Sequence, residues 1–125
     1  MPTSSITDVR TVGVTVSNQD DAIAFYVGTL GFEKIMDAPI SPTMRWVEVA
    51  PSGATTSIAL VVGDGAPAAG AETGIRFTVP DADAEHATMS RQGLIVGELL
   101  RWEGVPPMYT FDDPDGNRYV IVEAP

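Results

Sequence analysis

The sequence contains few of the side chains that most often carry out chemistry. It has one histidine, His86, and no cysteine, which excludes thiolate nucleophiles, disulfides and thiolate metal sites. His86 lies between Glu85 and Ala87 in a predicted helix, where a lone histidine is more often a packing or surface residue than a catalyst. No nucleophile–histidine–acid arrangement can be built around it.

Two arginines are better placed to bind a ligand. Arg76 lies in a predicted strand whose alternate residues form an apolar row, so its side chain must point to the opposite face. Arg118 lies near a turn and also points inward if it follows its strand's alternation. Two such guanidinium groups can hold a carboxylate, a phosphate or an enolate. The alternative is that they pair with Glu48 or another acid and only hold the structure together. The apolar row consists of Ile75, Phe77 and Val79.

One acid and several large side chains are further candidates. Glu48 lies between two valines in a predicted strand. It is either a proton acceptor or part of an exposed strand face. Aromatic walls suit flat organic ligands, although ordinary core or dimer packing is the alternative for each of these residues. The large side chains in question are Trp46, Trp102, Met108 and Tyr109.

The elements that must position these residues begin with a strand over residues 9–16, where valine alternates with threonine and glycine. A helix follows, with Ser17 and Asp20 predicted as its capping box and Gly31 as its left-handed C-terminal cap. The prolines at 39 and 42 predict a loop. The rest of this half is predicted as strands over 32–37, 44–50 and 55–62, a loop over 38–43 and a turn over 51–53.

After a segment rich in glycine, alanine and proline over residues 63–73, which predicts a linker, the pattern starts again. A strand over 74–79 leads to a helix that is capped by Asp81 or Asp83 and ends at Gly93. The remaining elements are predicted as strands over 94–100, 108–111 and 119–122, a loop over 103–107 and a turn over 113–117.

This return of the pattern is an internal repeat. Val16 and Val79 end equivalent strands 63 residues apart, and two further pairs of landmarks keep nearly the same offset. Each unit reads strand, helix, strand, strand, strand. Such a unit covers one sheet face with its helix and needs a partner for the other, which a second copy can supply. We therefore predict an α+β fold of two tandem βαβββ modules whose curved mixed sheets enclose a cleft. The further pairs are Gly31 with Gly93 and Gly53 with Gly116.

The repeat and two local strings resemble the vicinal oxygen chelate superfamily, which includes glyoxalase I, extradiol dioxygenases, and the fosfomycin and bleomycin resistance proteins. The resemblance covers residues 9 to 123 and implies one domain, with modules over residues 9–62 and 74–123. It also implies a ligand cleft between the modules and often a homodimer. The strings run from Val16 to Tyr26 with Leu30-Gly31-Phe32, and from Phe111 to Asn117.

The resemblance implies a divalent metal held by His and Glu from the first and last strands of each module. Carried over, the first-strand positions fall at Thr11 and Gly74. The last-strand positions fall at Val120 and at either Ala59 or Ser57. None of these residues is His, Asp or Glu, and a divalent site needs at least three good donors. We therefore expect no metal and no cofactor, and Thr11 becomes a candidate ligand-binding residue.

The expected function is that of a metal-free protein that binds a small organic molecule in the cleft, as a homodimer. The alternatives are a glyoxalase- or dioxygenase-like lyase or isomerase with an atypical site, in which Arg76 stabilises an oxyanion, and an accessory protein with a vestigial cleft. The net charge of −10, from 7 basic and 17 acidic residues, argues against nucleic acid and anionic membrane partners and is compatible with a cationic ligand. A cytoplasmic location is expected.

Overall fold

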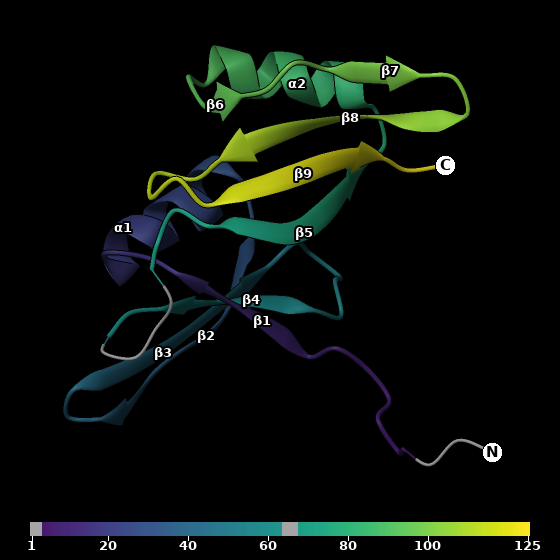
Figure 1. Ribbon diagram of the computed structural model, residues 1–125. Helices are drawn as coiled ribbons and strands as arrows, with labels where there is room; N and C mark the ends of the chain where they lie inside the picture. Colours follow the sequence, from purple (N-terminus) through teal and green to yellow (C-terminus); the bar gives the residue numbers. More distant parts are fainter. Residues whose placement is uncertain (1–3, 64–67) are drawn as a thin grey trace. The chain divides into compact units, whose positions relative to one another are not determined.

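The computed structural model describes residues 4–63 and 68–125 (Figure 1). They form two compact units, one on each side of the segment 64–67. Neither of the helices in these residues has the length and apolar character required to cross a lipid bilayer. The two units have the same internal organisation, which is described for each in turn.

The first unit is a four-stranded mixed sheet with a helical segment between its first two strands. The strand order is β1-β4-β3-β2, with β1 parallel to β4 and the other neighbours antiparallel. The predicted strand–helix–strand–strand–strand order is therefore confirmed. The elements are β1 (Thr11–Thr15), α1 (Gln19–Ile23), η1 (Ala24–Thr29), β2 (Glu33–Ser41), β3 (Met44–Ala50) and β4 (Ser57–Val61).

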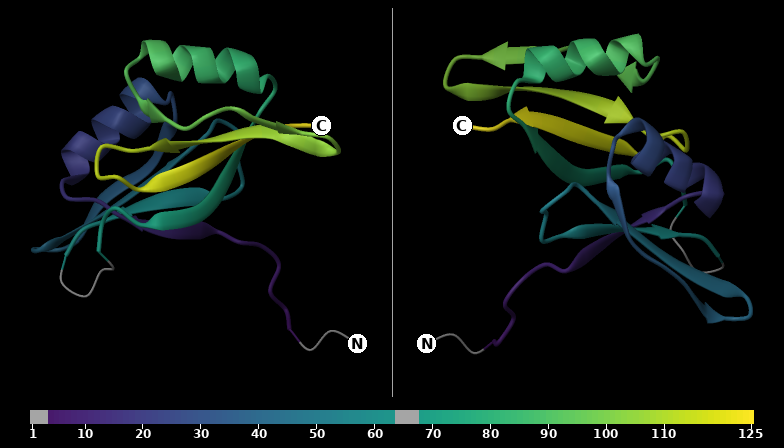
Figure 2. Two further views of the ribbon diagram at one scale, coloured as in Figure 1. Left: turned by 45° about the horizontal axis from the view of Figure 1, so that its top comes forward. Right: turned by 180° about the vertical axis from the view of Figure 1, so that it is seen from behind.

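The second unit repeats this topology. Its strand order is β5-β9-β8-β6, with β7 also paired to β8, and its first strand is again parallel to its last. Together β6 and β7 take the place of β2. Figure 2 shows α2 running along one side of this sheet. The elements are β5 (Glu72–Val79), α2 (Ala82–Arg91), β6 (Ile95–Val96), β7 (Leu100–Trp102), β8 (Val105–Asp112) and β9 (Arg118–Glu123).

The first helix differs from its prediction at its start and in its second half. The N-cap is Asn18, whose side chain accepts a hydrogen bond from the Asp21 N–H at 2.9 Å, so the predicted capping box of Ser17 and Asp20 is wrong. After Ile23 the helix widens into the π-helix η1, with the Leu30 N–H donating to the Phe25 carbonyl five residues back. Hydrophobic spacing does not distinguish a π turn from an α turn.

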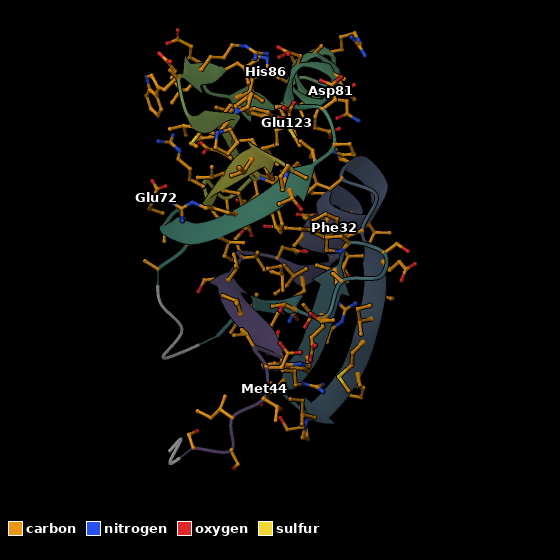
Figure 3. The ribbon with its side chains drawn as sticks, turned by 90° about the vertical axis from the view of Figure 1, so that its right-hand side faces the viewer. Phe32, Met44, Glu72, Asp81, His86 and Glu123 are labelled. Atoms are coloured by element: carbon orange, nitrogen blue, oxygen red, sulfur yellow. The ribbon has the colours of Figure 1, made fainter. Side chains whose placement is uncertain are left out.

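Proline misled the prediction at two strands. The predicted loop over residues 38–43 is wrong over residues 38–41, because β2 continues through Pro39, which pairs with Arg45, to Ser41, and only residues 42 and 43 form a turn. Since β2 is an edge strand, the missing proline N–H removes no ladder bond that the sheet needs. Similarly, β8 begins at Val105 inside the predicted loop over 103–107 and passes through two prolines. Figure 3 labels Met44 at the tip of the β2–β3 hairpin.

The predicted strand over residues 94–100 is also wrong, because it is interrupted after β6. Gly97 lies so close to β8 that a Cβ atom there would be 2.5 Å from the Thr110 hydroxyl oxygen. Its N–H donates to the Thr110 carbonyl at 2.8 Å, and its own carbonyl is 2.8 Å from His86 Nε2. This close approach explains why glycine occupies the point where β6 ends.

The predicted glycine landmarks are confirmed. Gly31 and Gly93 follow the two helical segments with φ of 79° and 81°, which is the left-handed conformation of a C-terminal cap. Gly53 and Gly116 have φ of 79° and 81° in the two turns. Asp81 caps α2 by accepting the Ala84 N–H at 3.1 Å, which resolves the choice between Asp81 and Asp83.

The turn from Asp113 to Asn117 ties the start of the second unit to its last strand. The Asp113 carboxylate accepts the N–H groups of Asp115 and Asn117 at 2.9 and 2.8 Å. The Asn117 side-chain oxygen then accepts the N–H groups of Gly70 and Ala71 at 2.9 and 3.2 Å. Both turn side chains are buried. The sequence from Phe111 to Asn117, the second of the two strings that carry the family resemblance, thus has a structural role: it fixes the segment of chain that leads into β5.

Candidate functional site

The sheet of the first unit has one apolar face and one mixed face. On the mixed face, register places Thr11 beside Ser57 and places Glu48 beside both Ala59 and Met36. Strand alternation puts the residues two positions away on the same side. We call this the groove face, and its residues are Thr11, Met36, Ala38, Trp46, Glu48, Ser57 and Ala59. The apolar face carries Val14, Val47, Val49, Ile58 and Leu60, all buried.

A pocket of about 510 Å³ opens on the groove face. Its walls are mostly apolar, and its charged groups are Arg10 and Glu48. The pocket therefore combines an apolar body with a small number of polar groups, which is the usual composition of a small-molecule site. The lining residues are Arg10, Thr11, Met36, Ala38, Pro39, Ile40, Trp46 and Glu48.

Glu48 is the central polar group of this pocket. Its side chain is buried, with 3% of its surface exposed, so the predicted exposed strand face is wrong for this residue. One carboxylate oxygen accepts the Ser57 hydroxyl at 2.6 Å, and the other accepts the Trp46 indole N–H at 2.6 Å. A nitrogen of Arg10 lies 3.7 Å from the second oxygen.

These contacts keep Glu48 ionised. The Ser57 hydroxyl bond, followed by the Trp46 indole bond, lowers the pKa of Glu48 below its usual range, against the opposing effect of burial. A carboxyl group with a lowered pKa is a weak proton acceptor at neutral pH. Glu48 is therefore better suited to bind a positive group or a hydrogen-bond donor than to act as a general base.

A second pocket of about 420 Å³ lies on the opposite face of the β2–β3 hairpin and includes its tip. Beside it, Arg45 makes two bonds to Asp37, at 2.7 and 2.8 Å, and one to Asp20 at 2.8 Å. The hydrogen bonds from Arg45 hold the pKa of Asp37 well below its usual range. All three charges are thus already paired, and this cluster ties the β2–β3 hairpin to the start of α1.

The second unit presents Arg76 on the sheet face opposite α2. Register places Arg76 beside Val120 and Phe77 beside Ile121, and the Phe77 ring stacks with Phe111. The predicted parity of this strand is therefore confirmed. Arg76 is exposed, and its hydrogen bond goes to the Gly74 carbonyl at 3.4 Å. Among the described residues of this unit, no acid lies within ion-pair distance of it.

Three other predicted residues share the side of the sheet that faces away from α2. Arg118 pairs with Asp112, which raises the pKa of the guanidinium, so the acid-paired interpretation holds for Arg118. Met108 is half-buried and follows the same strand alternation. Trp102 is exposed, and it points away from α2 because its neighbour Arg101 reaches Asp83 on that helix.

Tyr109, in contrast, belongs to the core. It is 1% exposed, its hydroxyl donates to the Met89 sulfur at 3.3 Å, and the His86 ring packs edge-on against it at 4.7 Å. Burial raises the pKa of the Tyr109 phenol. The prediction that Tyr109 lines a ligand cleft is therefore wrong, and core packing is correct. The predicted packing role of His86 is the one seen, and Figure 3 shows where it lies on α2.

The residues at the metal-ligand positions do not fit a divalent ion. Gly13 and Arg76 occupy equivalent positions in the repeat. Gly13 pairs with Ala59 and Arg76 pairs with Val120, so Ala59 and Val120 are also equivalent. Neither side chain can ligate, and the Thr11 hydroxyl is bonded to the Ser57 carbonyl at 3.2 Å. Over residues 4–63 and 68–125, no group of three or more histidines and acids could hold a metal ion.

Sequence reasoning found three pocket residues (Thr11, Trp46 and Glu48) and missed five. Ala38, Pro39 and Ile40 were missed because the prolines indicated a loop where β2 continues. Arg10 lies inside the predicted strand over 9–16, whose alternation places it on the side of Val12 and Val14, but β1 begins only at Thr11, so that alternation does not apply to Arg10. Met36 could have been found, since the strand over 32–37 was predicted and its pairing with β3 places this side chain next to Glu48.

The comparisons with known proteins agree with this fold. The chain belongs to the glyoxalase/bleomycin resistance protein/dioxygenase superfamily, whose family model matches residues 9–121. It is 33% identical to the uncharacterized protein YetH of Bacillus subtilis (strain 168) over 122 residues, which are 94% of this chain and 99% of that protein.

Two solved structures are also similar. One is a member of the same superfamily from Sphaerobacter thermophilus DSM 20745, with 35% identity, a TM-score of 0.89, and coverage of 95% of this chain and 98% of that one. The other is TnmS3, an antibiotic binding protein from Streptomyces sp. CB03234, with 34% identity, a TM-score of 0.85, and coverage of 98% and 99%.

Proposed function

We propose that this protein binds a small organic molecule without a metal ion, in the pocket on the groove face of its first unit. The observation that carries the proposal is this pocket of about 510 Å³, which is lined by apolar walls and by the buried carboxylate of Glu48. Its size is in the range of pockets that enclose drug-sized ligands. The similarity to an antibiotic binding protein at 34% identity supports the same function.

Binding is better supported than catalysis. A lyase or isomerase needs a Lewis acid or a general base. The family's metal positions carry Thr11, Ala59, Gly74 and Val120, and the buried acid Glu48 is a weak proton acceptor because its pKa is lowered. The Arg76 guanidinium in the second unit is able to stabilise an anion. The pocket of the first unit, however, offers no strong base that would generate an anion by proton transfer. The lyase or isomerase alternative therefore has no observation in its favour.

The test is ligand-dependent thermal unfolding with a panel of planar organic compounds, antibiotics among them. A compound at about 100 times its Kd adds about 2.7 kcal/mol to the free energy of unfolding. The substitution Ala38→Trp fills the pocket and should abolish the shift, whereas Ala54→Trp, in an exposed turn, should leave it unchanged. A panel without any shift contradicts the proposal, and a shift that survives Ala38→Trp places the ligand elsewhere.

Two further expectations belong to this proposal. Purified protein should contain no stoichiometric divalent metal, and about one bound Zn, Ni, Fe or Mn per chain would contradict it. We also propose a homodimer, since each sheet ends in edge strands that a second copy can pair or cover. Light scattering at micromolar concentration should give twice the mass of one chain, and a monomer mass would reject this assembly.

A further inference from the structure

The carboxylate of Glu48 is buried without full compensation of its charge. Two neutral donors, Ser57 and Trp46, each supply one hydrogen bond at 2.6 Å. A carboxylate offers about four acceptor sites, so two remain open. The positive charge nearest to it in the first unit belongs to Arg10, at 3.7 Å, which is longer than a hydrogen bond. A buried anion in this state gains from any cation that can reach it.

Arg10 shows that a cation can approach this oxygen and can also leave it. Its side chain is 79% exposed, so solvent screens its attraction to Glu48 and little else holds it there. Its backbone is fixed independently, because the Arg10 carbonyl accepts the Ser57 N–H at 3.0 Å. The side chain can therefore swing into solvent while the pocket keeps its shape.

The rest of the pocket suits a flat apolar body. Met36, Ala38, Pro39 and Ile40 line one side along β2, and Trp46 holds its indole against the carboxylate. The net charge of −10 raises the local concentration of cations around the whole protein. A ligand that carries both a planar apolar part and a positive group matches all of these features.

We propose that the pocket on the groove face selects planar organic cations, whose ammonium or amidinium group occupies the open sites of the Glu48 carboxylate and displaces Arg10. This inference rests on the proposed function and adds the chemical class of the ligand. The Trp46 indole fixes one carboxylate oxygen, Ser57 fixes the other, and the ligand's positive group completes the charge balance. Arg10 competes with the ligand for Glu48.

The experiment compares three probes of nearly equal size: naphthalen-2-ylmethylamine, 2-naphthylmethanol and 2-naphthoate. Binding is followed through the indole N–H signal of Trp46 in the NMR spectrum of nitrogen-15-labelled protein, with Trp102, which lies outside the pocket, as the internal reference. Ligands of this size bind with Kd values of about 1 mM. The amine should bind about tenfold more tightly than the alcohol, which is the usual worth of one charge-assisted hydrogen bond, and the naphthoate should bind more weakly than the alcohol.

Two variants test the roles of the residues. Glu48→Gln keeps the size of the side chain and should remove the preference for the amine, whereas the exposed control Glu33→Gln should retain it. Arg10→Ala removes the competitor and should tighten amine binding a few-fold without changing alcohol binding. Because Arg10 is exposed, this second variant remains informative if Glu48→Gln does not fold.

The outcomes separate the two proposals. If the alcohol moves the Trp46 signal at the same concentrations as the amine, the pocket binds organic molecules but Glu48 does not select a cation, and this inference is overturned while the proposed function stands. If Arg10→Ala weakens amine binding, the competition is absent and the inference is also overturned. If none of the probes moves the Trp46 signal up to about 10 mM, ten times the expected Kd, both proposals fail.

Discussion

The two sheets of this protein share one topology but carry different charged residues at the centre of their mixed faces. In the first unit this residue is an acid, Glu48, which is buried and held by two neutral donors. In the second unit it is a base, Arg76, which is exposed and donates a hydrogen bond to the Gly74 carbonyl on its own strand. The repeat has therefore preserved the backbone, while the side chains on the mixed faces have diverged.

The difference also extends to the aromatic residues. In the first unit Trp46 lies on the mixed face and donates to Glu48, whereas in the second unit Tyr109 lies on the opposite face, in the core beneath α2. An aromatic residue on a predicted strand can thus lie on either face of its sheet, and which face is the core depends on where the helix packs. The comparison can be tested by substitutions on each face.

The largest effect is expected at Tyr109. Tyr109→Ala should lower the free energy of unfolding by about 3–5 kcal/mol, because it removes a large buried ring from beside Met89 and His86. Tyr109→Phe should lose less than about 1.5 kcal/mol, the value of the hydroxyl bond. The exposed Trp102→Ala should change stability by less than about 0.5 kcal/mol. Urea unfolding measures these changes in the free energy of unfolding. Equal losses for both alanine variants would contradict the assignment of Tyr109 to the core.

The next effect concerns Arg76. Arg76→Ala should weaken binding of 2-naphthoate to the second unit by about 1.5–3 kcal/mol, the worth of a charged hydrogen bond. The amide signals of Val120, which pairs with Arg76, and of Thr110, which pairs with Val120 on the next strand, report this site. Arg91→Ala, on the exposed side of α2, is the control. If Arg76 instead pairs with Glu48 or another acid, the variant should lose stability and keep its affinity for the neutral 2-naphthylmethanol.

The smallest effect is a pH dependence at Glu48. Its pKa in the folded protein lies below the ordinary value of 4.5, so the ionised form adds stability that is fully present above that pH. This stability is lost as the pH falls through the lower, folded-state pKa. Glu48→Gln should be less stable than the natural protein by about 1 kcal/mol at pH 7. The gap should close in urea titrations below about pH 4, and a gap that widens there contradicts the assignment.

The sequence allowed the fold to be predicted well because the relevant signals are local and repeated. The valine alternation before residue 16, the glycines that end both helical segments and the turn from Asp113 to Asn117 each fix backbone geometry by themselves. The same signals recur at one offset, so an error in one copy is corrected by the other. Proline was the main source of error, since a strand tolerates it where no ladder bond is needed, as in the edge strand β2 and at the start of β8, before its pairing with β9 begins at Met108.

The candidate site could be predicted only in part. Thr11, Trp46 and Glu48 lie together as their strand positions imply, but the contacts of Glu48 with Ser57 and Arg10 join strand β3 to β4 and to the residue before β1. No pattern within one strand contains that information. The same holds for Tyr109, where alternation gives the side of the sheet but not which side the helix covers.

The parallel pairing of the first strand with the last strand in each unit has a consequence for synthesis on the ribosome. The strand β1 has β4 as its neighbour in the sheet, and β5 has β9. The first strand of each unit therefore cannot form its ladder of hydrogen bonds until the last strand of that unit has been made. For the first unit this occurs at residue 61, about halfway along the chain. The last strand of the first sheet is thus made before the first strand of the second, which reduces the time in which strands from the two similar units can pair with each other.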